Sequence, residues 1–167
     1  MIPTPGNCAG NIPLLKKSLN AFVALGHKAK SSDFEFVMRG FEGIKTLVQA
    51  VQIPVVGREP IELFAPYGVK FQQQGSPNTS GEMPITFLET VHGDVYKRLR
   101  ESSMRRCYWD ATLTLNCEEL PSGVAPLKFN IYNCWIKLDG VDLSTEDQSA
   151  VIKPAGTLYY NWFDYDA

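Results

Sequence analysis

Two histidines are the side chains of this sequence best suited to acid–base or metal chemistry, and neither has an evident partner. His27 and His92 lie far apart, with no carboxylate or cysteine at ligand spacing. Functional sites instead gather several perturbed titratable groups in one place. We therefore interpret both histidines as surface residues. We predict that the chain is not an enzyme and holds no metal or cofactor.

Other groupings of reactive residue types also lack the context that their chemistry needs. The carboxylate pair Glu118–Glu119 falls in a predicted turn, where acidic residues are common. The segment Gly40–Gly43 has no Lys-Ser/Thr pair, which a phosphate-binding loop requires. Ser102 and Ser103 lack the flanking glycines of a nucleophile elbow. These patterns give no support to nucleotide hydrolysis or acyl transfer.

The four cysteines match neither a zinc site nor a CxxC redox pair. Free cysteines are often buried, so we expect mostly reduced, buried thiols. If the two strands that flank Pro121 pair as a hairpin, Cys107 and Cys134 fall within a few residues of register. Cys8, in a segment rich in Pro, Gly and Asn, is the candidate for a disulfide between rings of an assembly.

Length and composition indicate a single folded domain. The 167 residues are 44% apolar and 20% charged, with a net charge of −2. This charge gives no general attraction to nucleic acid or membranes. No apolar run approaches the roughly 18 residues of a membrane-spanning helix. The N-terminus lacks a secretory signal pattern, so we expect cytoplasmic synthesis and no membrane anchor.

Alternating apolar and polar residues predict strands along most of the chain. Residues 109–117 alternate without a break, with Trp109, Leu113 and Leu115 on one face. Further strands are expected at 33–39, 44–53, 83–89, 127–138 and 156–165. Residues 44–53 also fit a helix, but their β-branched content and flanking Gly and Pro favour a strand. We predict a mainly β chain, a sandwich or barrel of about six or seven strands with one attached helix.

Three segments complete the expected organisation. Residues 94–105 form the clearest helix, with Asp94 at the N-cap and cations toward the C-terminal end. Residues 13–26 mix helical and strand periods, so either structure fits them. Residues 55–81 contain many Gly and Pro and predict a long loop, which is typical of a functional segment or one ordered on binding.

The order of these elements resembles the tail tube proteins of contractile-tailed bacteriophages. The matching pieces are Phe34–Phe36, Val48–Pro54, Met83–Glu89, the helix at 94–105, and the final block from Asn133 to Trp162. The resemblance covers residues 33–167 as a tail tube β-barrel domain and leaves 1–32 as an N-terminal arm or extension. Tube proteins of type VI secretion and other contractile injection systems share the fold.

The resemblance implies a structural virion protein of the tail, assembled in the host cytoplasm. Family members form homo-hexameric rings that stack into a hollow tube, through which DNA is ejected without specific binding. The implied partners are the tail sheath, baseplate and tape measure proteins. A tube protein of a bacterial contractile injection system is the alternative within this fold.

Subunit contacts are expected on strands that carry little charge, because exposed strand edges need pairing. The candidate intersubunit positions are Val48, Val51, Ile53, Ile85, Phe87, Tyr160 and Trp162. The candidate charged interface helix carries Lys97, Arg98, Arg100 and Arg105. These cations fit either a solvated helix face or contacts to acidic groups of another subunit or the sheath.

An alternative of a different class is a β-sandwich that binds carbohydrate or protein. Its platform would consist of Tyr159, Tyr160, Trp162 and Tyr165. Aromatic rings stack on sugars, but aromatics in alternating strands more commonly pack in cores and interfaces.

Overall fold

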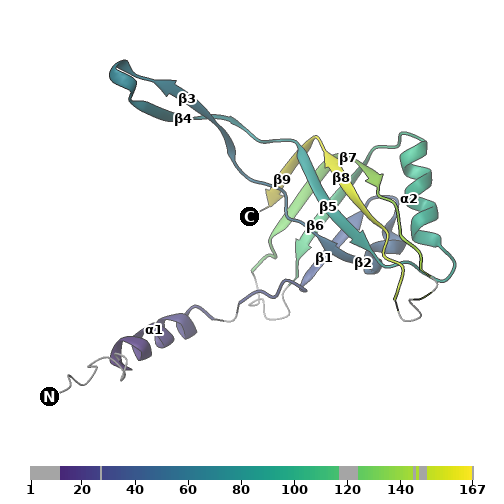
Figure 1. The fold of residues 1–167 in the computed structure, drawn as a ribbon. Coiled ribbons are helices and arrows are strands. Elements are labelled where there is room, and N and C mark those ends of the chain that lie inside the picture. Colours follow the sequence, from purple (N-terminus) through teal and green to yellow (C-terminus); the bar gives the residue numbers. More distant parts are fainter. Residues whose placement is uncertain (1–11, 27, 117–123, 145, 147–149, 167) are drawn as a thin grey trace.

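The computed structural model describes residues 12–26, 28–116, 124–144, 146 and 150–166, and strands dominate them (Figure 1). The strands are β1 (Phe34–Met38), β2 (Val48–Val51), β3 (Arg58–Phe64), β4 (Lys70–Pro77), β5 (Gly81–Phe87), β6 (Trp109–Leu115), β7 (Lys128–Leu138), β8 (Ala155–Tyr160) and β9 (Trp162–Asp166). The α-helices are α1 (Ile12–Ala24) and α2 (Asp94–Met104). The prediction of a mainly β, barrel-like chain is confirmed, but two α-helices replace the single one expected.

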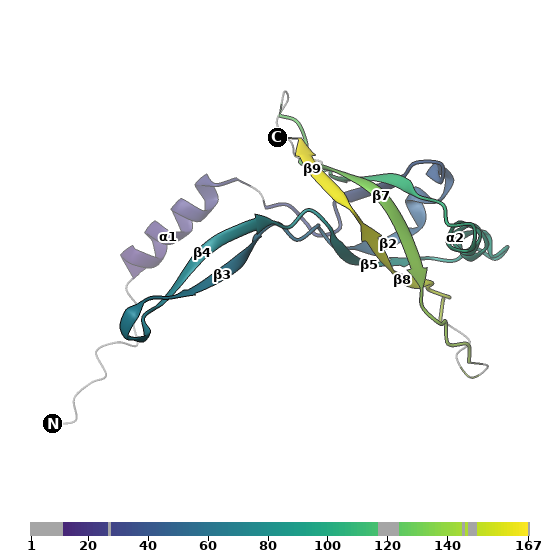
Figure 2. The same ribbon diagram turned by 90° about the horizontal axis from the view of Figure 1, so that it is seen from above.

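Six strands form one antiparallel sheet in the order β1–β6–β7–β8–β5–β2, which curls into an open barrel (Figures 1 and 2). Strand β9 joins this sheet by pairing with β7. Successive side chains of a strand point to opposite faces, so alternate residues fill the barrel interior. The largest fully buried side chains include Phe36, Met83, Phe87, Leu113, Ile131 and Leu158.

Strand β7 is shared by both halves of the barrel. It pairs with β6 along one edge and with β8 and β9 along the other. Trp135 lies opposite Tyr159 in β8, and Tyr132 lies opposite Trp162 in β9. Both pairings keep the same register, so β8 and β9 are two halves of one long strand interrupted at Asn161.

A bulge in β7 bends this central pairing. The register between β6 and β7 shifts between Trp109 and Ala111, where two residues of β7, Tyr132 and Asn133, face the single residue Asp110 of β6. Within the bulge, Asn133 has a φ of 52°, in the left-handed region that asparagine tolerates. Its backbone N–H donates to the carboxylate of Asp110 at 3.2 Å. The Asp110 side chain thus replaces a backbone partner at the bend.

Strands β2 to β5 form one long two-stranded ribbon. Strand β2 pairs with β5 inside the barrel, and β3 pairs with β4 beyond it. Between the two halves, the backbone N–H of Asn78 donates to the carbonyl of Gly57 at 2.9 Å. A 3-10 turn at Pro66–Gly68 closes the tip, and the outer half projects from the barrel in both views (Figures 1 and 2).

The prediction of a long irregular loop at 55–81 is therefore wrong. Ile61 and Leu63 alternate with Glu62, which is a strand signal. Pro60 and the glutamine run at 72–74 obscure that signal in the sequence.

Tyr160 fixes the base of this ribbon to the barrel. A Cβ at Gly81 would lie 2.7 Å from the Tyr160 hydroxyl oxygen, so only glycine leaves room for the ring. The ring also meets Phe163 edge to face, with centroids 5.8 Å apart. Burial raises the pKa of Tyr160, and a hydrogen bond with the Val55 backbone opposes this rise.

Residues 44–53 divide into two structures. Glu42–Leu47 is a 3-10 helix that buries Ile44, and only Val48–Val51 is a strand. The Glu42 carboxylate accepts a hydrogen bond from the Gly40 backbone N–H at 2.9 Å. Hydrogen bonds from backbone N–H groups, that of Gly40 foremost, lower the pKa of Glu42. The strand predicted over 44–53 is thus correct only for Val48–Val51.

Helix α2 packs along β7, and a residue that precedes the helix caps its N-terminal N–H groups. It buries Val95, Leu99 and Ser102. The Glu89 carboxylate accepts hydrogen bonds from the backbone N–H groups of Val95 at 3.0 Å and Tyr96 at 2.7 Å. An anion at this end is favoured by the helix dipole. The predicted N-cap role of Asp94 is wrong, because Gly93 occupies that position.

Helix α1 resolves the open choice between helix and strand at residues 13–26. Gly26, with a φ of 71°, follows its last turn and donates its N–H to the Val23 carbonyl at 3.0 Å. The Lys28 ammonium donates to the carbonyls of Phe22 and Gly26. No side chain of α1 is buried, so no packing against the barrel holds the helix.

Cys107 and Cys134 are both free thiols. The register places Cys134 opposite Trp109, so the predicted proximity in the hairpin is present without a disulfide. Cys134 lies in the core, and burial raises the pKa of its thiol to about 12. Cys107 is exposed. Cys8 and Cys117 lie outside the described residues.

Replacing Glu89 with glutamine should destabilise the protein by about 1–2 kcal/mol, because a charged acceptor at the start of α2 becomes neutral. Urea unfolding followed by circular dichroism measures the change. Glu82→Gln is the matched control, since Glu82 is exposed on β5. Equal stabilities of the two variants would contradict the capping role.

At pH 8, iodoacetamide should modify Cys107 in the folded protein and leave Cys134 unmodified. With a pKa of about 12, only about one in ten thousand Cys134 thiols is ionised at this pH. Peptide mass mapping reads both residues in one sample. Denaturation in urea should make Cys134 reactive, and equal modification before denaturation would refute its burial.

Candidate assembly surfaces

The barrel sheet ends in two strands, β1 and β2, that each have one partner. A cleft of about 600 Å³ lies between them, bordered also by residues 29–33 and the end of β6. Phe34, Val51, Ile53 and Leu115 make much of its lining apolar. Edge strands present unpaired backbone N–H and C=O groups, which favour pairing with another chain. These two edges and their cleft are the first candidate surface.

Three of the predicted intersubunit positions belong to the core of this chain. Ile85, Phe87 and Tyr160 are at most 3% exposed. Their strands β5 and β8 also have partners on both sides. The side chains of these three residues are therefore not open to a neighbouring subunit.

The other four predicted positions lie at or near the surface. Val48 and Val51 are partly buried on β2 and pack against the core. Ile53 is 44% exposed beside the cleft, and Trp162 is 52% exposed at the start of β9. The Trp162 indole N–H donates to the Asp164 carboxylate at 2.7 Å. Among the predicted positions, Ile53 and Trp162 offer the most surface for contact.

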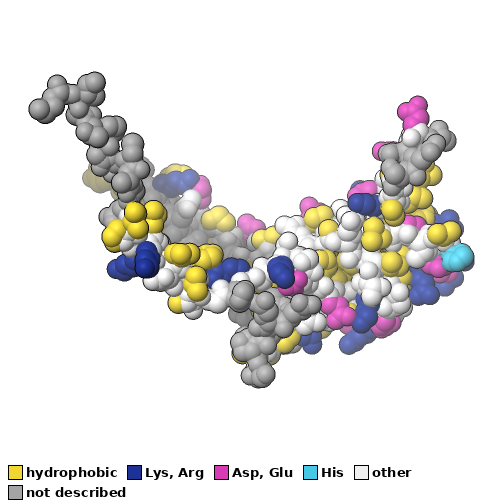
Figure 3. Space-filling view, turned by 90° about the horizontal axis from the view of Figure 1, so that it is seen from below, with side chains coloured by type: hydrophobic (Ala, Val, Ile, Leu, Met, Phe, Trp, Pro, Cys, Tyr) yellow, Lys and Arg dark blue, Asp and Glu magenta, His cyan; other side chains and the backbone are white. Residues whose placement is uncertain are grey.

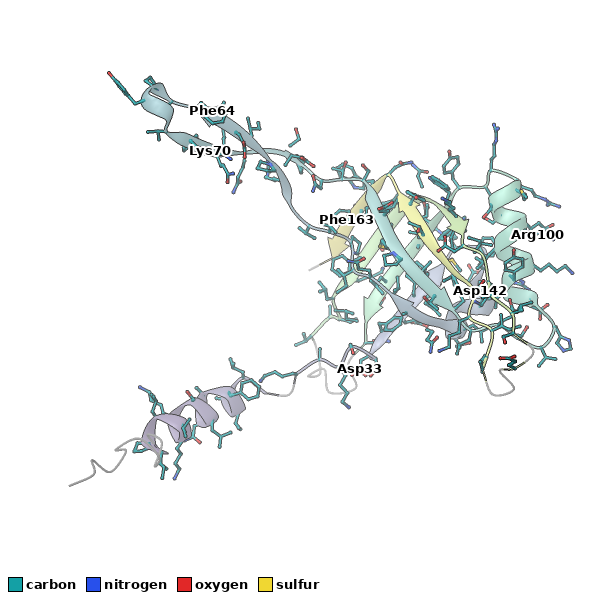
Figure 4. The ribbon with its side chains drawn as sticks, viewed as in Figure 1. Asp33, Phe64, Lys70, Arg100, Asp142 and Phe163 are labelled. Carbon is teal, nitrogen blue, oxygen red and sulfur yellow. The ribbon has the colours of Figure 1, made fainter. Side chains whose placement is uncertain are left out.

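The projecting β3–β4 hairpin has one mainly apolar face and one face that combines an ion pair with Phe64. Leu63 lies opposite Phe71, with Ile61 on the same face two residues away. On the other face, the Lys70 ammonium contacts the Glu62 carboxylate at 2.6 Å. Phe64 lies opposite Lys70 near the outer end of the hairpin (Figure 4). Sequence reasoning missed this apolar face because it treated the segment as a loop.

The four cations of the predicted interface helix all point to solvent from α2. Arg105 pairs with Glu101 at 2.8 Å on the same helix. Within the described part of the chain, Lys97, Arg98 and Arg100 have no ion pair. Figure 3 shows Lys and Arg side chains gathered at this end of the molecule. The cations therefore remain available to an acidic partner.

A groove of about 610 Å³ runs between α2 and a wall formed by Val141, Leu143, Ile152 and Pro154. Val141, Leu143 and Ile152 give it an apolar lining, while Lys97 and Arg100 border it from α2. Figure 4 shows Arg100 on the outer side of the helix. Apolar contacts combined with nearby cations suit an acidic segment of another protein.

The described residues do not assemble a convergent chemical site. They contain no group of three or more His, Cys, Asp or Glu side chains placed to hold a metal ion. His92 is exposed in the turn before α2, and His27 lies outside the described part of the chain. No described helix is long and apolar enough to cross a membrane.

The aromatic platform of the alternative binding module is divided between two faces. Tyr160 is buried, whereas Tyr159 stacks on Trp135 with ring centroids 4.3 Å apart. Trp162 lies at the start of the following strand, and the side chain of Tyr165 is outside the described atoms. Tyr160 therefore cannot share a binding platform with Tyr159.

No protein-family model matches this sequence, and no curated protein matches it. Solved structures match its fold. A chain in the extended sheath–tube complex of the extracellular contractile injection system PVC has a TM-score of 0.65 at 15% identity, covering 88% of this chain and 97% of that chain. A chain in the tube-terminating cap of the anti-feeding prophage has a TM-score of 0.64 at 10% identity, covering 84% and 92%.

A chain in the virion of a native gene transfer agent also matches, with a TM-score of 0.52 at 12% identity. The match covers 84% of this chain and all of that chain. At such identities the likeness establishes the fold alone. This chain therefore has the tube-like fold found in the sheath–tube and tube-cap structures of contractile injection systems.

Proposed function

We propose that this protein is the tube subunit of a contractile phage tail. In this proposal it forms homo-hexameric rings that stack into a hollow tube, and DNA leaves the capsid through that tube. The observation that carries the proposal is a barrel in the tube fold with two open edges and a projecting ribbon that no described residue covers. The role is structural and requires no catalytic residue.

Ring formation would cover the surfaces that a monomer leaves open. The edges of β1 and β2 carry backbone groups without ladder partners among the described strands. A closed ring of identical subunits hides such edges without producing open-ended aggregates. The β3–β4 hairpin projects well beyond the barrel, so it is suited to contact an adjacent ring (Figure 1).

The proposed tube lets DNA pass without holding it. Gln49 on β2, Thr86 on β5 and Thr157 on β8 give neighbouring strands uncharged polar side chains. Binding to DNA depends strongly on cations that neutralise phosphates. A lumen lined by this part of the sheet would therefore bind DNA only weakly. Lys137 on β7, opposite Thr157, is a cation at the border of this surface, whereas Lys97, Arg98 and Arg100 lie on α2, outside these strands.

The α2 cations and the neighbouring groove are the proposed contact for the tail sheath. Lys97 and Arg100 border an apolar groove that would accept an acidic sheath segment. The baseplate and the tape measure protein are the other partners of this proposal, which places the protein in the tail of the virion. The same surfaces would also serve a contractile injection system of the PVC kind, whose sheath–tube complex shares the fold.

Particle composition separates the two settings. A phage tail would copurify with a capsid that contains nuclease-protected DNA. A bacterial injection particle would carry sheath and baseplate proteins without packaged DNA.

Replacing Ile53 with aspartate should prevent ring formation and leave a folded monomer. Ile53 is partly exposed beside the β1–β2 cleft, so the new charge enters the proposed interface rather than the core. Burying an unpaired charge costs several kcal/mol, about 3–5, at each interface of a ring. Sedimentation velocity and negative-stain microscopy at high protein concentration measure the assembly.

Val91→Asp is the matched control, because Val91 is fully exposed in the turn before α2, away from both edges. It should assemble as the unmodified protein does. Normal rings from Ile53→Asp would refute the edge assignment. A stable monomer of the unmodified chain at high concentration would refute the tube function itself.

A further inference from the structure

Helix α1 and the β3–β4 hairpin each leave an apolar face uncovered outside the barrel. We propose that α1 of one copy packs against the apolar face of the hairpin of a neighbouring copy. This inference rests on the self-association proposed above and names two surfaces that meet in it.

The apolar face of α1 is a continuous stripe. Ile12, Leu15, Leu19 and Val23 recur at helical spacing and are 59–67% exposed. Lys17 lies on the opposite face. A helix with this pattern normally buries its stripe against another element, yet no residue of α1 is buried.

The hairpin presents a face of the same kind. Ile61, Leu63 and Phe71 lie together on one side and are 44–57% exposed. The ion pair between Glu62 and Lys70 occupies the other side. Phe64 also lies on that side, opposite Lys70. The first side groups three apolar side chains, so it gains more from losing contact with water.

Neither element is of a kind that is stable alone. Helix α1 has 13 residues, and isolated helices of about 12–15 residues are marginal in water. A single two-stranded hairpin is also marginal without a third strand or a helix on one face. A helix laid on the hairpin would supply what each element lacks.

The two elements lie apart within one copy, on the same side of the barrel (Figures 1 and 2). Each copy contributes one helix and one hairpin. In a head-to-tail contact, every helix meets a hairpin and every hairpin meets a helix. Such a contact repeats around a closed ring or along a stack.

The charges beside the two faces are complementary. Helix α1 contains no acidic residue, and Lys16 borders its stripe. Glu59 lies two residues before Ile61, on the apolar side of the hairpin. Neither Lys16 nor Glu59 has an ion pair among the described residues. A contact between copies can therefore place opposite charges along its rim.

An anionic membrane surface is the competing occupant, because basic amphipathic helices also bind lipid. The matching apolar face on the hairpin of the same chain favours a second copy instead. A membrane would cover the helix and leave the hairpin face exposed.

Crosslinking between two differently tagged full-length chains tests the pairing. One chain carries Leu19→Cys and the other carries Leu63→Cys. The chains are mixed, assembled and oxidised. In the control, Lys17→Cys replaces Leu19→Cys and places the thiol on the opposite face of α1. The heterodimer yield of this control also measures the background from native cysteines such as the exposed Cys107. We expect at least about tenfold more heterodimer from the Leu19/Leu63 pair, because disulfides form only at short Cα separations.

Equal heterodimer yields from both pairs in assembled particles would overturn the inference. A crosslink found only when one chain carries both cysteines would also overturn it, since the contact would then lie within a copy. Failure of the unmodified chain to form rings or tubes would instead reject the proposed function.

Charge variants give an independent measurement. Leu19→Glu should reduce assembly at least about tenfold, whereas Lys17→Glu should leave it unchanged, because only the first change buries a charge. Flotation with phosphatidylcholine–phosphatidylserine vesicles tests the membrane alternative. Normal assembly of Leu19→Glu, together with loss of vesicle binding, would overturn the pairing in favour of lipid.

Discussion

The continuous register of β7 against β8 and β9 holds the two halves of the barrel together. One strand of 11 residues supplies backbone hydrogen bonds to three others. Near its centre, β7 carries a bulge, and there the Asp110 carboxylate accepts the N–H of Asn133 in place of an ordinary ladder partner. A side chain of the neighbouring strand β6 thus bridges the bend.

The molecule divides into a well-packed barrel and two arms with little packing of their own. The barrel buries large apolar side chains on every strand of its sheet except β2 and β9, whose described apolar residues are at most partly buried. Helix α1 buries none, and every residue of β3 is exposed. Ordering a chain segment costs entropy that burial must offset. Among the described residues, neither arm has burial that offsets this cost. In the proposed assembly, contacts between copies would stabilise the arms, so that their stability and the association of copies would be linked.

Local sequence patterns predicted the barrel better than the arms. The alternation at 109–115 identified β6, and the spacing of Val95 and Leu99 identified the buried side of α2. In both elements one face is buried and the other is exposed. The sequence therefore shows apolar residues at the spacing of a strand or of a helix. The hairpin has a weaker pattern because one proline and a run of glutamines interrupt it, and its face is not buried. The residue that caps α2 was also not evident from the sequence, because Glu89 lies before the helix and contacts its N-terminal N–H groups through its side chain.

The predicted intersubunit positions are divided between core and surface for a related reason. Sequence identifies strands with little charge, but it does not say which strands are interior to the sheet. Tyr160 and Ile85 have the composition of interface residues, and their place between paired strands makes them core. The exposed cations of α2 follow from helical periodicity alone and lie where expected. The order of strands in the sheet is a long-range property that local patterns do not contain.

The two-stranded ribbon from β2 to β5 also has a mechanical consequence. Its strands run along the length of the projection, from inside the barrel to the tip at Pro66–Gly68 (Figure 1). A pull on the tip along this direction loads the hydrogen bonds of β2 and β5 to their neighbours in shear, so many of them must break together. No separate hinge domain lies between the tip and the barrel to absorb the load. Tension applied at the hairpin is therefore transmitted directly into the barrel wall.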